Sequence, residues 1–465
     1  MLRTHAAIDR AHEIVARNLL QPMYQLQRYM RPSRREDVRA FYAGMAFRRR
    51  ASGWSADRKR EYLMLRLRET VRRAWREVPF YRDLYNRIGF DPRDQFGFDD
   101  FAQLPVLERE MVRDAGSMMI SSAIRGDALR KDSTGGSAGF PTEIWTGPEE
   151  RGWRESGFEF HMRLIGVPAG ASICYLWGHH LDPMGTDRLR DRLHAALGNY
   201  RWYECLRLNR DRLVEYHHAL QRWRPTCVVA YSTALAALAD IVQGLGDAPA
   251  YPRKRLVTGA EKLYSNDRVL VEEVYACPVH ERYGTRDVGL VGFQLEVDRS
   301  HDFVVDWANV FVEPEGPGLR ACILVTKLHA DAMPMIRYRI GDLGRFSGDS
   351  ARGHPALVLH EVLGRETYRV WLSEHQWVDG LEFPHLMKDY PVREFQVVQS
   401  ADMSVVVRVV PLAGFTPRSK DQILELVRKN LGGLDVRLEL VGSVARTPSN
   451  KRRPVITEYK GSGGA

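Results

Sequence analysis

The sequence of 465 residues has few cysteines and no long hydrophobic run. Its five cysteines are scattered and never spaced as CxxC, so we expect neither a disulfide framework nor a zinc ribbon. The N-terminal segment lacks the apolar core of a secretory signal, and no stretch approaches the roughly 18 apolar residues that span a bilayer. We therefore expect a cytoplasmic protein without membrane insertion.

The formal net charge is a modest +9, and much of the surplus arginine precedes residue 130. These arginines alternate with Leu, Tyr and Trp at helical spacing, as in RLRETVRRAWREVP. Such interleaving is more typical of the solvated faces of amphipathic helices than of a nucleic-acid interface. We expect no nucleic-acid partner.

The chain is longer than the roughly 250 to 300 residues that one hydrophobic core organises, so two domains are expected. Helical periodicity dominates early. Short β-rich runs such as TCVVAYS and RLVTGAE then alternate with helical stretches such as STALAALADIVQGL. Beyond Phe303, further β-runs such as DFVVDWANVFVE follow without helices. The pattern predicts an α/β fold: a large N-terminal domain with a helical cap, a parallel α/β sheet and a β-barrel-like part, plus a small mobile α+β C-terminal domain. The predicted parts are a cap over 1–125, a core over 126–363, a hinge over 364–367 and a small domain over 368–465.

The first chemical motif is the run STGGSAGFPT at 133–142. Its glycines permit tight turns that expose successive backbone N–H groups, and its hydroxyls add donors, so the loop can cradle phosphate oxygens. It lacks the GK[ST] ending of a Walker loop. An ordinary flexible turn is the alternative interpretation.

The second motif is ERYGTRD at 281–287, preceded by VTGAE at 257–261. Tyr283 beside a glycine can stack on a purine, the Thr285 hydroxyl can reach a phosphate, and the Asp287 carboxylate can hold Mg²⁺ bound to that phosphate. Each of these pieces is commonplace when it occurs alone.

The third and fourth motifs are PMIRYRIGDLGR at 334–345 and RTPSNKRRPVI at 446–456. Asp342 can accept hydrogen bonds from both hydroxyls of a ribose, with Gly364 and Arg365 following about twenty residues later. A surface turn tied by Arg–Asp pairing is the alternative there. Lys451 on its loop can enter an active site as a point charge, and a solvated basic tail is the alternative.

Together and in this order, the motifs resemble the adenylate-forming superfamily, in its branch of phenylacetate-CoA ligase-like and capsular-polysaccharide CapK-like proteins. The resemblance runs from about Tyr81 and includes VPFYRDLY, LPVLERE, GAEKL, YGTRD and LHADAMPMIRYRIGDLGRF. It implies ATP and Mg²⁺ as cofactors and coenzyme A as co-substrate.

The resemblance also implies a role for each matching position. Lys451 and Thr285 would act on the carboxylate and α-phosphate, and Asp287 would hold the metal. The nucleotide would be bound by the phosphate loop, the adenine pocket and the ribose pair, which are Ser133, Thr134, Gly135, Gly136, Ser137, Gly139, Gly259, Ala260, Glu261, Tyr283, Gly284, Asp342 and Arg365.

The chain departs from the family pattern at four of these motif positions. Ala138 replaces a loop threonine, Asp287 is one methylene shorter than the usual Glu, Thr367 replaces the hinge Asp, and Asn450 replaces a glycine before Lys451. None of these substitutions removes an indispensable charge. Together they keep a slow or specialised enzyme as an alternative.

The predicted reaction is ATP-dependent adenylation of a small, possibly aromatic, carboxylic acid, with release of pyrophosphate and acyl transfer to coenzyme A. Transfer to an amine or a hydroxyl, and a nucleotide-binding scaffold without catalysis, are the alternatives. His179 lies where the superfamily often places an aromatic gate to the acyl pocket; a structural surface pair with His180 is the alternative, and the one we favour. Trp177, Tyr231 and Trp202 are candidates for the aromatic lining of that pocket. The sequence does not identify the acid.

Overall fold

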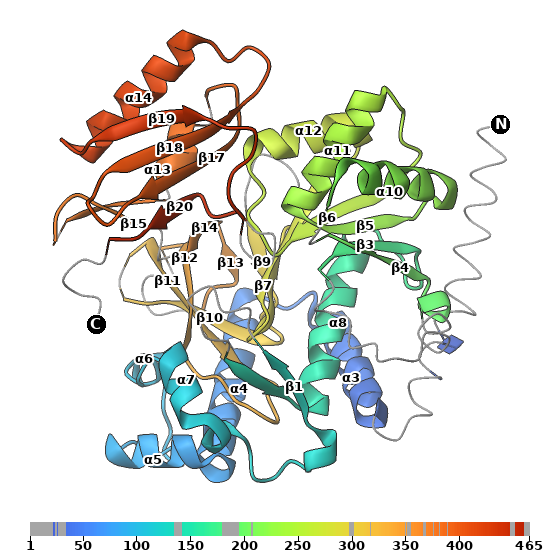
Figure 1. Cartoon of the computed structure of the whole chain (residues 1–465). Helices are drawn as coiled ribbons and strands as arrows, with labels where there is room; N and C mark the ends of the chain where they lie inside the picture. Colours follow the sequence, from blue (N-terminus) through green and yellow to red (C-terminus); the bar gives the residue numbers. More distant parts are fainter. Residues whose placement is uncertain are drawn as a thin grey trace.

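The computed structural model describes most of the chain in a single arrangement (Figure 1). The residues it describes are 22–23, 26, 34–133, 142–178, 195–205, 208–296, 302–316, 318–348, 350, 355–365, 369–374, 376–380, 382–387, 389–446 and 452–459.

Helices form the base of the molecule, as the early periodicity predicts. In α4, Leu63, Leu67, Val71 and Ala74 recur every three or four residues and are all buried, while Ser55 caps the N-terminus by accepting from Arg58 N at 3.3 Å. The elements of this base are α3 (Arg35–Ala51), α4 (Ala56–Glu77), α5 (Pro79–Arg87), α6 (Phe98–Ala102), α7 (Arg109–Ala115), η3 (Gly116–Met119) and η4 (Gly126–Ala128).

An eight-stranded sheet in the order β13-β9-β8-β7-β6-β5-β3-β4 confirms the predicted α/β core. The five strands from β7 to β4 are parallel, and β8, β9 and β13 add antiparallel pairs at the other side. The strands are β3 (Ile173–Trp177), β4 (Tyr200–Glu204), β5 (Cys227–Tyr231), β6 (Arg255–Gly259), β7 (Val279–Thr285), β8 (Gly289–Phe293), β9 (Phe303–Val305) and β13 (Val358–Leu359). The helices are α8 (Pro148–Leu164), α10 (Arg210–Trp223), α11 (Ser232–Leu245) and α12 (Ser265–Tyr275).

The part predicted as barrel-like is a four-stranded antiparallel sheet in the order β10-β11-β12-β14. The run DFVVDWANVFVE divides at a turn into β9 and β10, because Asn309 N bonds back to the Asp306 carbonyl at 2.8 Å. The strands of this sheet are β10 (Val310–Pro314), β11 (Arg320–Lys327), β12 (Tyr338–Arg345) and β14 (Glu361–Arg365). A separate hairpin pairs β1 (Arg130–Ser133) with β2 (Glu143–Thr146).

The C-terminal part folds as an α+β unit with its own apolar core. Ile423, Val427 and Leu431 of α14 pack against Val397 and Val407 of a sheet ordered β19-β18-β17-β20. Its elements are β15 (Arg369–Trp371), β16 (Trp377–Asp379), α13 (Glu382–Met387), β17 (Val392–Gln399), β18 (Val405–Pro411), α14 (Pro417–Leu431), β19 (Val436–Leu440) and β20 (Val455–Thr457). The hinge over 364–367 stays a prediction.

The small unit lies against helices α11 and α12 of the large one (Figure 1). Arg393 pairs with Asp240 at 2.7 Å, and Asn266 Nδ2 donates to the Val392 carbonyl at 2.9 Å. A cavity of about 270 Å³ lies at this boundary, lined by residues of α10 and α11 together with Arg393 and Arg446. The boundary therefore rests on polar contacts around an incompletely filled space.

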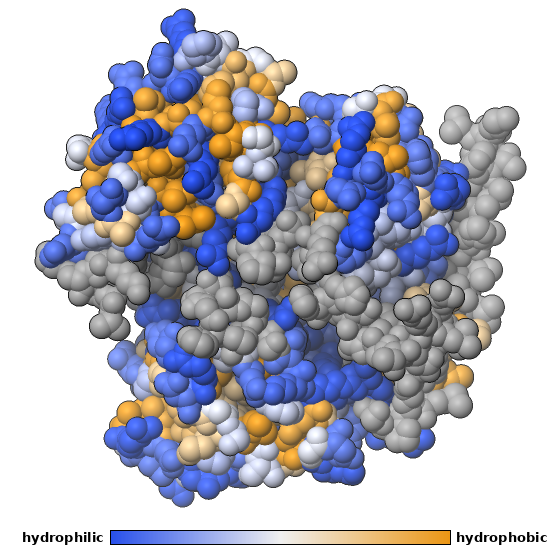
Figure 2. Space-filling view, viewed as in Figure 1, coloured by the Kyte–Doolittle hydropathy of each residue, from blue (hydrophilic) through white to orange (hydrophobic). Residues whose placement is uncertain are grey.

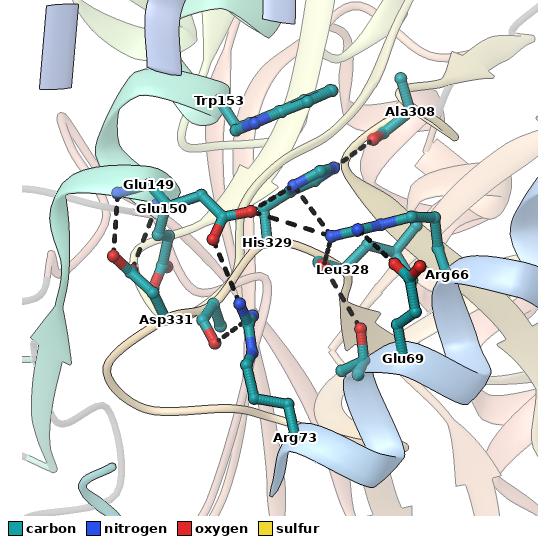
Figure 3. Close-up of polar contacts among 12 residues, drawn as sticks. Arg66, Glu69, Arg73, Glu149, Glu150, Trp153, Ala308, Leu328, His329 and Asp331 are labelled. Carbon is teal, nitrogen blue, oxygen red and sulfur yellow. Dashed lines mark hydrogen bonds and ion pairs between the residues drawn. The ribbon is translucent and has the colours of Figure 1, made fainter. Parts of the chain in front are cut away.

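A buried polar cluster ties the helical base to α8 and to the segment after β11 (Figure 3). The His329 ring stacks on Trp153 with centroids 3.5 Å apart, and its Nδ1 lies 2.9 Å from Glu149 Oε1. Arg73 of α4 donates to Glu149 at 3.1 Å, while Asp331 accepts from the backbone N–H of Glu149 at 2.9 Å at the start of α8. These contacts fix the position of His329 and Asp331, at the start of the segment that leads to Asp342.

Within the described ranges, no helix is long and apolar enough to cross a bilayer. Figure 2 shows charged and polar residues over most of the helical base, and apolar residues gathered on the visible face of the small unit.

Candidate active site

Three residues predicted to bind the nucleotide come together at the end of β7. The Tyr283 hydroxyl donates to Asp342 Oδ2 at 2.7 Å, and Arg365 Nε lies 3.1 Å from Asp342 Oδ1. Burial and the neighbouring Asp342 carboxylate raise the pKa of Tyr283, so the phenol remains a neutral donor. Gly341, with φ +79°, sets the backbone turn just before Asp342. A carboxylate has about four acceptor sites, so Asp342 retains capacity for further hydroxyl donors.

A second tyrosine–carboxylate pair holds Asp287. The Tyr338 hydroxyl donates to Asp287 Oδ2 at 2.7 Å, and Arg109 Nη2 lies 3.3 Å from the same oxygen. Burial and the Asp287 charge raise the pKa of Tyr338, which also remains protonated. Within the described part of the chain, Asp287 Oδ1 accepts no hydrogen bond. It is also not one of the buried side-chain atoms that lack a partner there. Among the described residues, one oxygen of the Asp287 carboxylate is therefore without a hydrogen-bond donor.

A buried cation lies near Asp287. Lys327 Nζ contacts Glu150 Oε1 at 3.0 Å, and Arg154 reaches the same carboxylate at 3.3 Å. Burial lowers the pKa of Lys327, while the charges of Glu150 and Asp287 oppose that shift. Because Arg154 also donates to the Arg286 carbonyl at 3.2 Å, helix α8 fixes the turn that carries Asp287.

The predicted phosphate loop joins the two strands of the β1–β2 hairpin. Ser133 ends β1 opposite Glu143 of β2. Arg286 Nη1 lies 3.6 Å from Asp132 Oδ1, which brings this hairpin beside the end of β7. Thr285 Oγ1 accepts from Val288 N at 3.4 Å, in the same turn. The remaining loop positions lie outside the described residues, namely Thr134, Gly135, Gly136, Ser137 and Gly139.

The residues predicted to line the adenine pocket follow β6. Ala260 adopts φ +68°, an uncommon conformation for a residue with a Cβ. Glu261 accepts from the Thr233 hydroxyl at 2.6 Å through Oε2, while its buried Oε1 has no partner within the described ranges. Gly284 is required on β7 because a Cβ there would overlap the Gly289 carbonyl oxygen of β8.

The candidate acyl-pocket residues Trp177 and Tyr231 meet at the carboxyl ends of β3 and β5. Their rings lie edge to face with centroids 4.5 Å apart, and both residues are largely buried. Trp202 stacks instead on Tyr175, at 4.9 Å on the neighbouring strands. His179 lies outside the described residues.

Lys451 also lies outside the described residues, but its neighbour Arg452 is described. The Arg452 guanidinium pairs with Asp267 of α12 and lies 3.8 Å from Glu394 of β17. It also stands over the Tyr264 ring, 5.1 Å from the centroid. Although burial alone would lower it, these carboxylates raise the pKa of Arg452. The lysine loop is therefore anchored to the large unit at its end.

Sequence analysis missed Arg109, Tyr338, Arg282 and Arg452. Arg109 lies in LPVLERE and Tyr338 in PMIRYRIGDLGR, so both lay inside recognised runs. Their contacts with Asp287 were not predicted, because α7, β7 and β12 come together only in the folded chain.

No family model matches the chain. It is 22% identical over 326 residues to a phenylacetate-coenzyme A ligase of Pseudomonas putida, which covers 67% of this chain and 71% of that protein. It is 19% identical over 368 residues to the protein CapK of Staphylococcus aureus, covering 77% of this chain and 80% of CapK.

Solved structures show the same fold. A 2-hydroxyisobutyryl-CoA ligase in its postadenylation state, in complex with 2-HIB-AMP, superposes with a TM-score of 0.67 at 19% identity, over 87% of this chain and 90% of that one. The same ligase in its thioesterification state, with 2-HIB-AMP and CoA, gives 0.55 at 18% identity, over 87% and 91%. The chain is therefore similar in sequence to phenylacetate-coenzyme A ligases and to CapK, and it has the fold of the adenylate-forming ligases.

Proposed function

We propose that the enzyme uses ATP and Mg²⁺ to convert a small carboxylic acid to its acyl-AMP, releasing pyrophosphate, and then transfers the acyl group to coenzyme A. The observation that carries the proposal is the convergence of two tyrosine–carboxylate pairs, Tyr283–Asp342 and Tyr338–Asp287, where β12 meets β7 and the turn that follows β7. Cytoplasmic location follows from the supply of ATP and coenzyme A there.

The reaction joins two anions, because the acid's carboxylate attacks the α-phosphorus of ATP. The site must therefore supply positive charge and hold both partners in line. Asp342 and Arg365 would bind the ribose, and Tyr283 would lie against the base. Thr285 would donate to the α-phosphate from the turn that also carries Asp287.

The residues present fit a magnesium ion. Mg²⁺ in nucleotide enzymes is usually held by one or two carboxylates together with substrate phosphates. Asp287 offers one oriented carboxylate with its second oxygen unbonded within the described residues. The ion would supply positive charge at the phosphates. Tyr338 and Arg109 would orient the Asp287 carboxylate toward it.

Lys451 would supply charge at the carboxylate and α-phosphate from the small unit. The higher TM-score against the postadenylation state, 0.67 compared with 0.55, supports a docked arrangement of the two units. Anchoring of Arg452 on Asp267 would hold the loop there, and rotation of the small unit about 364–367 would release it for acyl transfer.

The test is acid-dependent ATP–pyrophosphate exchange with a panel of aryl and aliphatic acids. We expect exchange with at least one acid and at least about a 10²-fold loss in K451A, as for removal of one preorganised transition-state donor. K429A, which removes an exposed lysine of α14, is the matched control. Tight ATP binding without exchange for any acid would favour a non-catalytic scaffold instead.

The acceptor is tested separately, by adding coenzyme A, amines or alcohols to reactions that already form acyl-AMP. Thioester formation supports the proposal. Amide or ester formation without any thioester would replace coenzyme A by the second candidate, an amine or hydroxyl acceptor.

A further inference from the structure

The Arg282 side chain lies among aromatic rings rather than among carboxylates. Its Cζ is 4.3 Å from the centroid of the Trp177 ring and 5.1 Å from that of Phe158. Trp177 in turn meets Tyr231 edge to face. Arg282 as a whole is half-buried.

Within the described ranges, Arg282 makes no ion pair and no hydrogen bond. The arginines around it are neutralised: Arg268 pairs with Glu281 at 2.7 Å, and Arg286 pairs with Asp132 at 3.6 Å. Among the described residues, Arg282 is therefore a positive charge without a carboxylate partner.

The carboxylate of Glu261 at the end of the neighbouring strand does not pair with it either. Glu261, at the end of β6, directs Oε2 to Thr233 at 2.6 Å and forms no ion pair with Arg282. Burial lowers the pKa of Arg282, which measures the cost of enclosing an unpaired cation. Ring faces offset only part of that cost. An anionic ligand would offset the remainder.

The backbone holds the Arg282 side chain in this position. A Cβ at Gly259 would lie 2.8 Å from Arg282 Cγ and 3.0 Å from its Nε. The Arg282 side chain thus passes through the space that a side chain at position 259 would fill. This close fit restricts the rotamers of Arg282.

Arg282 and Tyr283 are consecutive on β7, so their side chains point to opposite faces of the strand. Tyr283 points to Asp342 on the side of the nucleotide residues. Arg282 points to Trp177 and Tyr231, at the carboxyl ends of parallel strands, where ligands of open α/β sheets bind. The charge therefore lies on the side assigned to the acid.

We propose that the acid carries a second anionic group, in the simplest case a second carboxylate, and that Arg282 binds this group while the first carboxylate is adenylated. The inference rests on the proposed function and narrows its substrate class to dianionic acids with an apolar body. A planar guanidinium fits a carboxylate with two parallel hydrogen bonds, and Trp177 and Tyr231 would contact the apolar part.

The test compares matched acids that differ by one carboxylate: phenylacetate with 4-carboxyphenylacetate, and hexanoate with adipate. In ATP–pyrophosphate exchange, we expect the wild type to prefer the diacid in at least one pair by about 100-fold in kcat/KM, the effect of a well-placed buried charge pair. R282M should bring that ratio close to 1, and R282K should retain part of it. Preference for the monoacid in both pairs, or an unchanged ratio in R282M, would overturn the inference.

A binding measurement separates this inference from the proposed function. Titration calorimetry of the same four acids into wild-type protein and R282M needs no turnover. If no acid supports exchange, the adenylation proposal fails, yet diacid binding that weakens at least tenfold in R282M would still establish the anion site. Equal binding of diacids by both proteins would reject Arg282 as that site, whatever the exchange assay shows.

Discussion

The Tyr338 hydroxyl donates to Asp287 Oδ2 at 2.7 Å, and this contact fixes the one carboxylate that the account assigns to the metal. Tyr338 begins β12 and Asp287 follows β7, so two sheets meet at this hydrogen bond. Because Tyr338 donates to Oδ2, it does not occupy Asp287 Oδ1, the oxygen proposed to bind the metal.

The first prediction concerns this pair. D287N removes the charge, so we expect ATP–pyrophosphate exchange to fall at least about 10²-fold. Y338F removes one hydrogen bond to a charged group, worth roughly 1.5 to 3 kcal/mol, and should lower exchange about tenfold or more. The half-saturating Mg²⁺ concentration should rise in both variants. Y42F, at an exposed tyrosine of α3, is the control. Exchange in D287N at the level of Y42F would remove Asp287 from the metal site.

The second prediction concerns the space that Arg282 fills. G259A adds a methyl group 2.8 Å from Arg282 Cγ, so the side chain must shift. We expect KM for the best acid to rise about tenfold or more. G244A, where an added Cβ meets nothing within 4 Å, is the matched control on α11. Equal acid KM values in the two variants would contradict the fit.

The third prediction concerns the contact between the two units. Arg452 is buried against Asp267 of α12, and removal of one partner from a buried pair costs about 3 to 5 kcal/mol. R452A should therefore loosen the docked small unit, increase protease cleavage in the segment after Gly364 and lower exchange about tenfold. R437A, which breaks an exposed pair with Asp435 in the same unit, is the control. Identical cleavage patterns in R452A and R437A would show that this pair does not hold the docking.

The fourth prediction concerns stability in acid. Burial lowers the pKa of His329 from its usual value of 6.5 to about 4, although Glu149 opposes the shift. Between these values the unfolded chain binds a proton that the folded chain excludes, so stability falls as pH drops from 6.5 to 4. The loss amounts to at most about 3 kcal/mol.

Denaturant unfolding of wild type and H329Q at several pH values measures this effect. Because the substitution removes the His329 contribution, the stability of H329Q relative to wild type should rise as pH falls from 6.5 to 4. Asp331, whose pKa burial raises to about 6, gives the opposite slope from 3.8 to 6 and is present in both proteins. Parallel curves for the two proteins would exclude His329 as the source.

Sequence alone predicted much of this fold because its signals are local. The run STALAALADIVQGL predicted α11, and TCVVAYS and RLVTGAE predicted β5 and β6, since apolar periodicity and glycine placement decide such elements. The division of DFVVDWANVFVE into β9 and β10 was missed, because a turn inside an apolar run has no strong sequence signature.

The site was predicted less completely. Tyr283, Asp342 and Arg365 were placed together by motif, and the structure brings them into contact. Arg282 was not singled out, because its meaning depends on which carboxylates fail to reach it. That property belongs to packing between strands rather than to any residue spacing.

The most direct test of the central claim follows an oxygen atom from the acid. The enzyme is supplied with ATP, coenzyme A and an accepted acid labelled with ¹⁸O in its carboxylate, and the products are analysed by mass spectrometry. Attack on the α-phosphorus predicts one ¹⁸O in the phosphate of AMP and none in pyrophosphate. Formation of ADP, or of AMP without the label, would contradict the account.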